Sequence, residues 1–270
     1  MTDISASFVK HFQGDVHLAY QQMGSKLKTA VRSQTGVKGS TAVFQKVGKG
    51  LAATKTRHGD VPVMNLTHAP VECALADFYA GDWVDSLDEL KINHDERRVV
   101  ACAGAYALGR KTDELIISAL AGATNVVGDG SDPLDKAMVM EAFSALNLAD
   151  VPDDGQRFGV VSPAGWNALL ALPEFSDSAY VGDELPFLKG SESRKWLGIV
   201  WIMHNGLPLA EDARSCFVFH KSAVGHASGA EVQTDITWHG DKAAYFINNM
   251  MSQGAALIDQ EGVVKILAGE

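Results

Sequence analysis

The sequence predicts an α+β fold, in which helices and strands occupy separate stretches of the chain. Residues 5–32 and 93–121 carry apolar side chains at helical spacing, whereas residues 41–47 are rich in strand-forming residues. Short mixed elements follow from residue 122 onward. Since 46% of the 270 residues are hydrophobic, the chain can form one large domain or two small ones.

The first element is an amphipathic helix predicted over residues 5–32. Apolar residues recur there at steps of three and four, at Phe8, Phe12, Val16, Ala19, Met23, Leu27 and Ala30. Gly14 and Gly24 lie inside it, and each costs about 1 kcal/mol relative to alanine, so the helix needs a partner surface. We therefore expect an N-terminal arm over residues 1–36. Its expected assembly contacts are Phe8, Phe12, Val16, Met23 and Leu27.

A long β-hairpin is predicted over residues 37–80. Its first strand is Thr41–Val47, and a second strand is predicted from Val61 onward, with Val71, Cys73 and Leu75 on one face. Hairpin connections usually have two to five residues, so a connection this long is functional or mobile. We expect its cations to contact another copy of the chain, and they are Lys46, Lys49, Lys55 and Arg57.

A long helix is predicted to begin at Asn93, with Glu96 completing a capping box, and to end near Ala121. Small residues in its middle, among them Gly104, Ala105 and Gly109, allow another backbone to approach closely. We expect this helix to be the spine of a domain over residues 81–124. Just before it, Asp82, Asp85 and Asp88 are spaced by three and are expected along one face of a helix.

The rest of the chain predicts a second domain over residues 125–240, followed by C-terminal strands over residues 241–270 that return to the domain of the long helix. Asp132 and Pro133 open a predicted helix that ends near Leu148, and Ser162 caps another. A turn is predicted over residues 150–155. Strands are predicted over residues 158–161, 199–203, 216–219, 232–238, 245–258 and 262–267.

The net charge of −10 is divided unevenly along the chain. Residues 1–57 carry nine Lys and Arg against two Asp, a net charge of +7. The remaining residues carry 14 basic and 31 acidic side chains, a net charge of −17. A basic head on an acidic body predicts either nucleic-acid binding or contact with the acidic body of a neighbouring copy, and charge alone does not choose between them.

No catalytic, cofactor-binding or metal-binding residues are predicted. Ser162 precedes a proline as a helix cap and lies in no Gly-x-Ser-x-Gly elbow, and Gly48-Lys49-Gly50 lacks P-loop spacing. Gly128-Asp129-Gly130 is expected to be a loop. No metal-ligand spacing links His220, His226 and His239, and core thiols are expected at Cys73, Cys102 and Cys216. No apolar run is long enough to span a membrane.

The order of these parts resembles the Hong Kong 97-type shell fold of tailed-phage capsid proteins and encapsulins. In that family they are called the N-arm, the extended loop, the spine helix of the peripheral domain, and the axial domain. Segments similar to phage capsid proteins are Tyr79–Asp85, Ala105–Glu114, Val160–Leu170, Gly198–Val200, Phe217–Gly225 and Gly254–Ile266.

The resemblance implies a major capsid protein of a tailed double-stranded DNA phage, a structural protein without a cofactor. It is expected to assemble with itself in hexamers and pentamers, to meet a portal and a separate scaffolding or decoration protein, and to enclose double-stranded DNA. It implies synthesis in the host cytoplasm and a place in the virion, with no membrane partner.

Two departures and two alternatives accompany this resemblance. Some relatives carry a scaffolding segment before the arm, whereas here the arm begins close to Met1. Some relatives join a lysine of the extended loop to an asparagine of a neighbouring subunit. Lys49 or Lys55 would be that lysine here, but no match identifies the asparagine or the catalytic glutamate. The alternatives are an encapsulin-like cargo shell, which a cargo-peptide pocket would distinguish, and a cytoplasmic enzyme of unknown reaction, for which no acid, base and nucleophile set is found.

Overall fold

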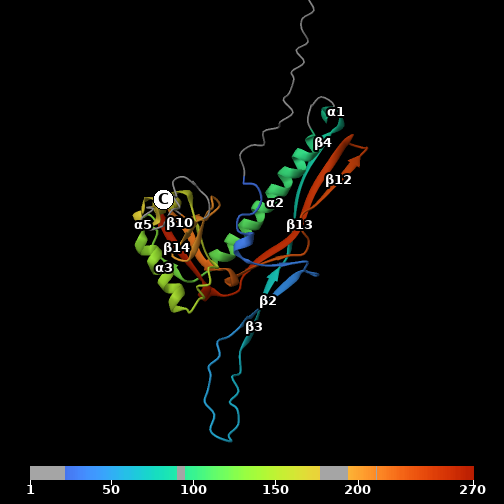
Figure 1. Ribbon diagram of the computed structural model, residues 1–270. Coiled ribbons are helices and arrows are strands. Elements are labelled where there is room, and N and C mark those ends of the chain that lie inside the picture. Colours follow the sequence, from blue (N-terminus) through green and yellow to red (C-terminus); the bar gives the residue numbers. More distant parts are fainter. Residues whose placement is uncertain (1–21, 90–94, 177–193, 211) are drawn as a thin grey trace, which may run out of the picture.

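The longest helix and the longest strand run side by side and join the other elements into one molecule (Figure 1). The computed structural model describes residues 22–89, 95–176, 194–210 and 212–270. The helices and helical turns are η1 (Lys28–Ala30), α1 (Ser86–Glu89), α2 (Glu96–Ala121), α3 (Lys136–Leu148), α4 (Pro163–Ala171), α5 (Pro173–Ser176), η2 (Lys221–Ala223) and η3 (Gln260–Gly262).

A seven-stranded sheet forms the rounded end of the molecule, with α3, α4 and α5 beside it (Figure 1). Its strand order is β5 (Val126–Val127), β14 (Val263–Gly269), β10 (Ala213–His220), β6 (Arg157–Val161), β8 (Ile199–Met203) and β7 (Arg194–Trp196), with β9 (Leu209–Ala210) pairing β10. These strands read as apolar runs because both faces of the sheet are covered. The fully buried side chains of this core include Val160, Trp201, Phe217, Phe219, Val264 and Ile266.

A five-stranded sheet forms the elongated half. Its path is β1 (Arg32–Thr35), β11 (Val224–Ser228), β13 (Ala244–Leu257) and β12 (Gln233–His239). Strand β4 (Ala76–Asp85) also pairs β13, over residues 244–253, which include the residues that pair with β12. Helix α2 lies along β13 and β4. A separate two-stranded hairpin, β2 (Thr41–Val47) and β3 (His68–Ala74), extends away from this sheet (Figure 1).

Helix α2 ends at Ala121 as predicted, but its N-cap is Asp95 and not Asn93. The Asp95 carboxylate accepts a hydrogen bond from the backbone N–H of Arg98 at 3.2 Å, which satisfies one of the orphan donors of the first turn. Its buried side chains begin at the middle of the helix and continue toward its C-terminal end, where Ile116, Ile117 and Leu120 join the main core: Leu108, Thr112, Asp113, Ile116, Ile117 and Leu120.

The predicted arm helix over residues 5–32 is wrong in its last third. Phe8, Phe12 and Val16 lie outside the described residues. From residue 22 the chain is extended and irregular apart from η1, and Arg32 already begins a strand. Gly24 adopts φ +79°, which interrupts a right-handed helix, and the next backbone N–H groups point to a side chain of α2.

Three further predictions need correction. Asp82 and Asp85 lie in β4 and not on a helix face, because this segment pairs with β13 along its whole length. The second hairpin strand begins at His68 and not at Val61. Helix α3 begins at Lys136, where the Asp135 side chain caps it by accepting the N–H of Met138 at 2.8 Å, so Asp132 lies in the preceding loop.

Other elements agree with the sequence. Strands β2 and β8 have the predicted bounds, and Ser162 caps α4 by accepting the N–H of Gly165 at 3.0 Å. The strand pairing, however, does not follow the boundary predicted at residue 240. β12 joins β13 in the five-stranded sheet, whereas β14 joins β10 in the other sheet, where its buried run of valine and isoleucine is covered on both sides. In the described part of the chain, no helix is long and apolar enough to cross a membrane.

Candidate assembly surfaces

The base of the hairpin is fixed to the body of its own chain. Ala42, Phe44 and Cys73 are buried against Ala227 and Ile258. The predicted face with Cys73 therefore does pack inward, and its neighbours Val71 and Leu75 are partly buried beside it. The hairpin leaves the body from a rigid base.

The connection between the two hairpin strands runs from residue 48 to residue 67, longer than the sequence predicted. Its ends are held by a hydrogen bond from the N–H of Gly48 to the carbonyl of Thr67 at 2.8 Å. Figure 1 shows the connection projecting as a long loop beyond β2 and β3. A segment of this length inside a folded domain is usually functional.

The four predicted hairpin cations have different environments. Lys46 lies in β2, not at the tip, and its Nζ atom is 2.7 Å from the carboxylate of Asp259 in the same chain. Lys49 reaches the exposed Asp150 at 3.2 Å, a contact that solvent screens. Lys55 and Arg57 are exposed and form no ion pair among the residues that the structure describes.

Apolar side chains on the same connection were not identified from the sequence. Leu51 is 88% exposed and Val63 is 79% exposed, and three more apolar residues beside them are also exposed, namely Val61, Met64 and Leu66. The pattern from Val61 onward predicts a strand, but in the structure no strand forms before His68. Monomeric proteins rarely expose such a group of large apolar residues, so this loop is suited to contact another chain.

The small residues of α2 do accommodate close approach of other segments. A Cβ atom on Gly109 would lie 2.6 Å from the Cα atom of Gly24, so a side chain there collides with the backbone of the N-terminal segment. A Cβ atom on Gly104 would lie 2.2 Å from the amide nitrogen of the buried Asn249 in β13. Ala105 is half-buried, and its expected role in packing stays a prediction.

Asp113 of α2 holds the N-terminal segment against the spine. Its buried carboxylate accepts the backbone N–H groups of Lys26 at 3.0 Å and Leu27 at 3.1 Å. It also accepts hydrogen bonds at 2.5 Å from the side chains of Gln22 and Ser25. Burial acts to raise the pKa of Asp113, but these donors and His204 outweigh it and lower the pKa.

This anchoring divides the predicted arm contacts into two kinds. Leu27 is fully buried in the core of its own chain, beside Ile116 and Leu120 of α2, so it is not available to a neighbour. Met23 is 74% exposed and remains available. The sequence could not separate the two, since both fit one helical stripe.

A family model described as "Phage capsid protein" matches residues 4–270. The chain belongs to this family.

Solved structures agree with this assignment at the level of the fold. The chain is similar to the Mycobacterium phage Che8 structure, with 20% identity, 97% of each chain covered and a TM-score of 0.75. It is similar to the capsid of cyanophage P-SCSP1u, with 16% identity, 98% of this chain and 94% of that chain covered, and a TM-score of 0.76. A native GTA particle capsid computed with C5 symmetry matches with 10% identity over 96% and 94% and a TM-score of 0.72. No curated protein sequence matches.

The protein is therefore a structural phage capsid protein, with the Hong Kong 97-type fold and a place in the virion shell. Capsid proteins of this family are not enzymes. Ser162 is occupied as a helix cap, and burial raises the pKa of the Cys216 thiol to about 11. Among the described residues, no group of three His, Cys, Asp or Glu side chains could hold a metal ion.

The elongated half of this capsid protein also exposes large apolar side chains. Strand β12 lies at the edge of its sheet, and Ile236 and Trp238 on it are exposed. Tyr79 and Trp83 on β4 are exposed as well. An edge strand with apolar residues is a template for contact with another chain.

Proposed function

We propose that this capsid protein assembles into hexamers and pentamers that close an icosahedral shell around double-stranded DNA. One observation carries the proposal: a hairpin with a buried base presents a long apolar loop that no described part of its own chain covers. A similar structure, that of a native GTA particle, is itself a capsid, which supports assembly of this chain with copies of itself.

The loop joins two kinds of interaction in this proposal. Leu51, Val61 and Val63 supply apolar area that stabilises contact with a neighbour at about 25 cal/mol per Å² buried. Lys49, Lys55 and Arg57 direct the loop to an acidic surface, because each neighbour carries the acid excess of residues 58–270. Each copy gives its loop to one neighbour and receives a loop from another, as closed rings require.

The N-terminal arm has the same role beyond its anchor. Residues 22–27 hold one end of the arm on α2 through Asp113, so the part that precedes them starts from a fixed point. We propose that Phe8, Phe12 and Val16, together with Met23, contact neighbouring subunits. Removal of residues 1–21 should then block closure of the shell while the subunit stays folded.

The remaining partners follow from the shell function. We propose a portal at one vertex and a separate scaffolding or decoration protein, with synthesis in the cytoplasm of the bacterial host. The acid excess of the body makes strong binding of packaged DNA unfavourable, so the DNA is enclosed and not tightly held.

The hairpin tests this proposal because its apolar and charged residues can be changed separately. Replacing Leu51, Val61 and Val63 by Ser should abolish sedimenting shells at every salt concentration. Replacing Lys49, Lys55 and Arg57 by Glu should reduce shell yield most at low salt, since charges are screened beyond about 10 Å at 0.1 M. Circular dichroism should show native spectra for both variants.

The matched control replaces the exposed apolar residues Leu87 of α1 and Val126 of β5 by Ser, which lie outside the hairpin. These changes should leave shell yield intact. Shells of normal yield from both hairpin variants would contradict the proposed role of the hairpin.

A further inference from the structure

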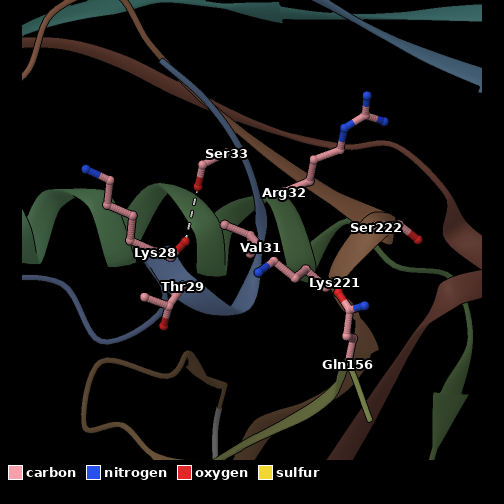
Figure 2. Close-up of a pocket in the computed structure, with 8 residues that line it drawn as sticks. All are labelled: Lys28, Thr29, Val31, Arg32, Ser33, Gln156, Lys221 and Ser222. Atoms are coloured by element: carbon pink, nitrogen blue, oxygen red, sulfur yellow. Dashed lines mark hydrogen bonds between the residues drawn. The ribbon is translucent and has the colours of Figure 1, made fainter. Parts of the chain in front are cut away.

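An open recess lies where the N-terminal segment crosses the body of the capsid protein (Figure 2). Its volume is about 610 Å³, and its walls come from η1, β1, η2 and Gln156, the residue before β6. Three cations line it, Lys28, Arg32 and Lys221, and no carboxylate does. Lys28 and Arg32 belong to the basic residues 1–57, and Lys221 joins them from the acidic remainder of the chain.

These cations have no acidic partner in the part of their own chain that the structure describes. Among the residues that the structure describes, neither Lys28, Arg32 nor Lys221 forms an ion pair, and Arg32 lies 5.7 Å from the ring of Phe44. Figure 2 shows Lys221 reaching into the recess, while Lys28 and Arg32 point to opposite sides of it. The charges are therefore spread along a rim, which fits an extended acidic surface better than one small anion.

The same chain carries a surface of opposite sign. Two adjoining recesses of about 660 and 640 Å³, which share Asp129 and Pro133, lie around the loop that leads into α3. The first is lined by the exposed carboxylates Asp129, Asp132, Asp135 and Glu141. Within the described chain no Lys or Arg pairs with these four, and Lys136 beside them is engaged by Glu174 at 2.5 Å.

We propose that in the assembled shell the basic recess of one subunit receives this acidic surface of a second copy. The inference rests on the proposed shell function, because it needs copies in repeated contact. Two different patches that meet between successive copies make a heterologous contact, the kind that generates rings. Complementary charge at such a contact sets its register and excludes wrong pairings. A DNA backbone is the other polyanion available, but the net charge of the subunit repels it.

Zero-length crosslinking tests the contact directly. Carbodiimide joins lysine amines to carboxylates only at ion-pair distance. Shells are assembled from equal amounts of ¹⁴N and ¹⁵N protein, crosslinked, and digested for mass spectrometry. Lys136–Glu174 and Lys46–Asp259, at 2.5 and 2.7 Å, should give links within one copy and serve as positive controls.

The inference expects mixed-isotope links from Lys28 or Lys221 to Asp129, Asp132, Asp135 or Glu141. Shells that give the positive-control links but none of these overturn it, as do links from Lys28 and Lys221 to other carboxylates only. Lysines that react in empty shells and become protected only when DNA is present also overturn it, because DNA is then the occupant. If the wild-type chain forms no shells, the proposed function fails first and this inference with it.

A charge exchange gives the second readout. Replacing Lys28, Arg32 and Lys221 by Glu, or Asp129, Asp132 and Glu141 by Lys, should each lower shell yield about tenfold or more. A chain that carries both sets should recover most of the yield, since attraction returns with the signs exchanged. A control with Lys111, Lys195 and Lys242 changed to Glu alters net charge as much as the first variant and should assemble. No recovery in the combined variant would overturn the pairing of these two surfaces.

Discussion

The carboxylate of Asp113 lies 3.1 Å from the Nε2 atom of His204, and both side chains are buried. The same carboxylate accepts the backbone N–H groups of Lys26 and Leu27. One side chain of α2 thus joins the N-terminal segment, the spine helix and the end of β8. The shell contacts proposed for the arm depend on this fixed point.

Replacement of Asp113 by Asn should therefore destabilise the subunit by about 1–3 kcal/mol at pH 7. The amide has one acceptor oxygen where the carboxylate has two, so buried donors lose partners. Urea unfolding measures the change. The control Glu114→Gln alters the next residue, whose carboxylate faces solvent and pairs with Lys111, and should change stability by less than about 0.5 kcal/mol. Equal midpoints for both variants would contradict the role of Asp113.

The pKa of Asp113 is lowered from its ordinary value of 3.8, so its contribution is present above pH 3.8. This contribution to stability is lost only as the pH falls through the pKa of Asp113 in the folded chain, which lies below 3.8. The Asp113→Asn variant should therefore lose the steep fall in stability below pH 3.8 that the wild type shows. Urea midpoints measured from pH 4.5 down to pH 2.5 test this sign.

His226 predicts a separate pH dependence at milder pH. It is fully buried, its Nε2 atom lies 3.1 Å from the side-chain oxygen of Gln253, and burial lowers its pKa below 6.5. The unfolded chain therefore binds a proton that the folded chain does not, so stability falls as the pH drops below 6.5. Replacing His226 by Gln should flatten this dependence between pH 7.5 and 5.5, whereas His239→Gln, at a half-buried site on β12, should not. Identical slopes in the two variants would argue against His226.

At Gly109, packing and helix propensity predict opposite effects of an alanine substitution on the stability of the subunit. Alanine inside a helix is normally about 1 kcal/mol better than glycine. Here a Cβ atom would lie 2.6 Å from Gly24 Cα, so Gly109→Ala should destabilise the subunit by about 1–3 kcal/mol. In α4, Gly165→Ala meets no atom closer than 3.3 Å and should cost less. Thermal unfolding compares the two, and a stabilised Gly109→Ala variant would show that the segments do not cross there.

Leu27 and Met23 lie on one stripe in the sequence and should respond differently. Leu27→Ala removes a fully buried side chain and should cost about 2–5 kcal/mol. Met23→Ala, at an exposed site, should change stability by less than about 0.5 kcal/mol and should lower shell yield instead. Chemical unfolding and sedimentation separate these effects. A similar loss of stability in both variants would mean that residues 22–27 are not seated as described.

Much of the fold could be predicted from the sequence, because local signals agree with it. Strand-forming residues fixed the bounds of β2, and a Ser-Pro pair marked the start of α4. These elements owe their limits to residues inside them. Strands β8 and β10 could also be predicted from their own residues. Both faces of their sheet are covered, so these strands are nearly continuous apolar runs without an alternation of polar side chains.

The errors occurred where distant residues decide the structure. The chain around Leu27 has helical periodicity. However, the N–H groups of Lys26 and Leu27 donate their hydrogen bonds to Asp113, far along the sequence, and not to carbonyl groups of a helix. Asp82 and Asp85 have helical spacing, but pairing with β13 makes their segment a strand. The exposed Leu51 and Val63 could not be recognised as surface residues, because exposure is a property of the folded chain.

Electron microscopy of the overexpressed chain tests the central claim most directly. Negatively stained particles from the wild-type lysate should include closed shells or capsomer rings with fivefold and sixfold averages, and their number should fall in the hairpin and arm variants. A purified wild-type chain that stays a featureless monomer, with a native circular dichroism spectrum at high protein concentration across a range of salt, would contradict self-assembly as its function.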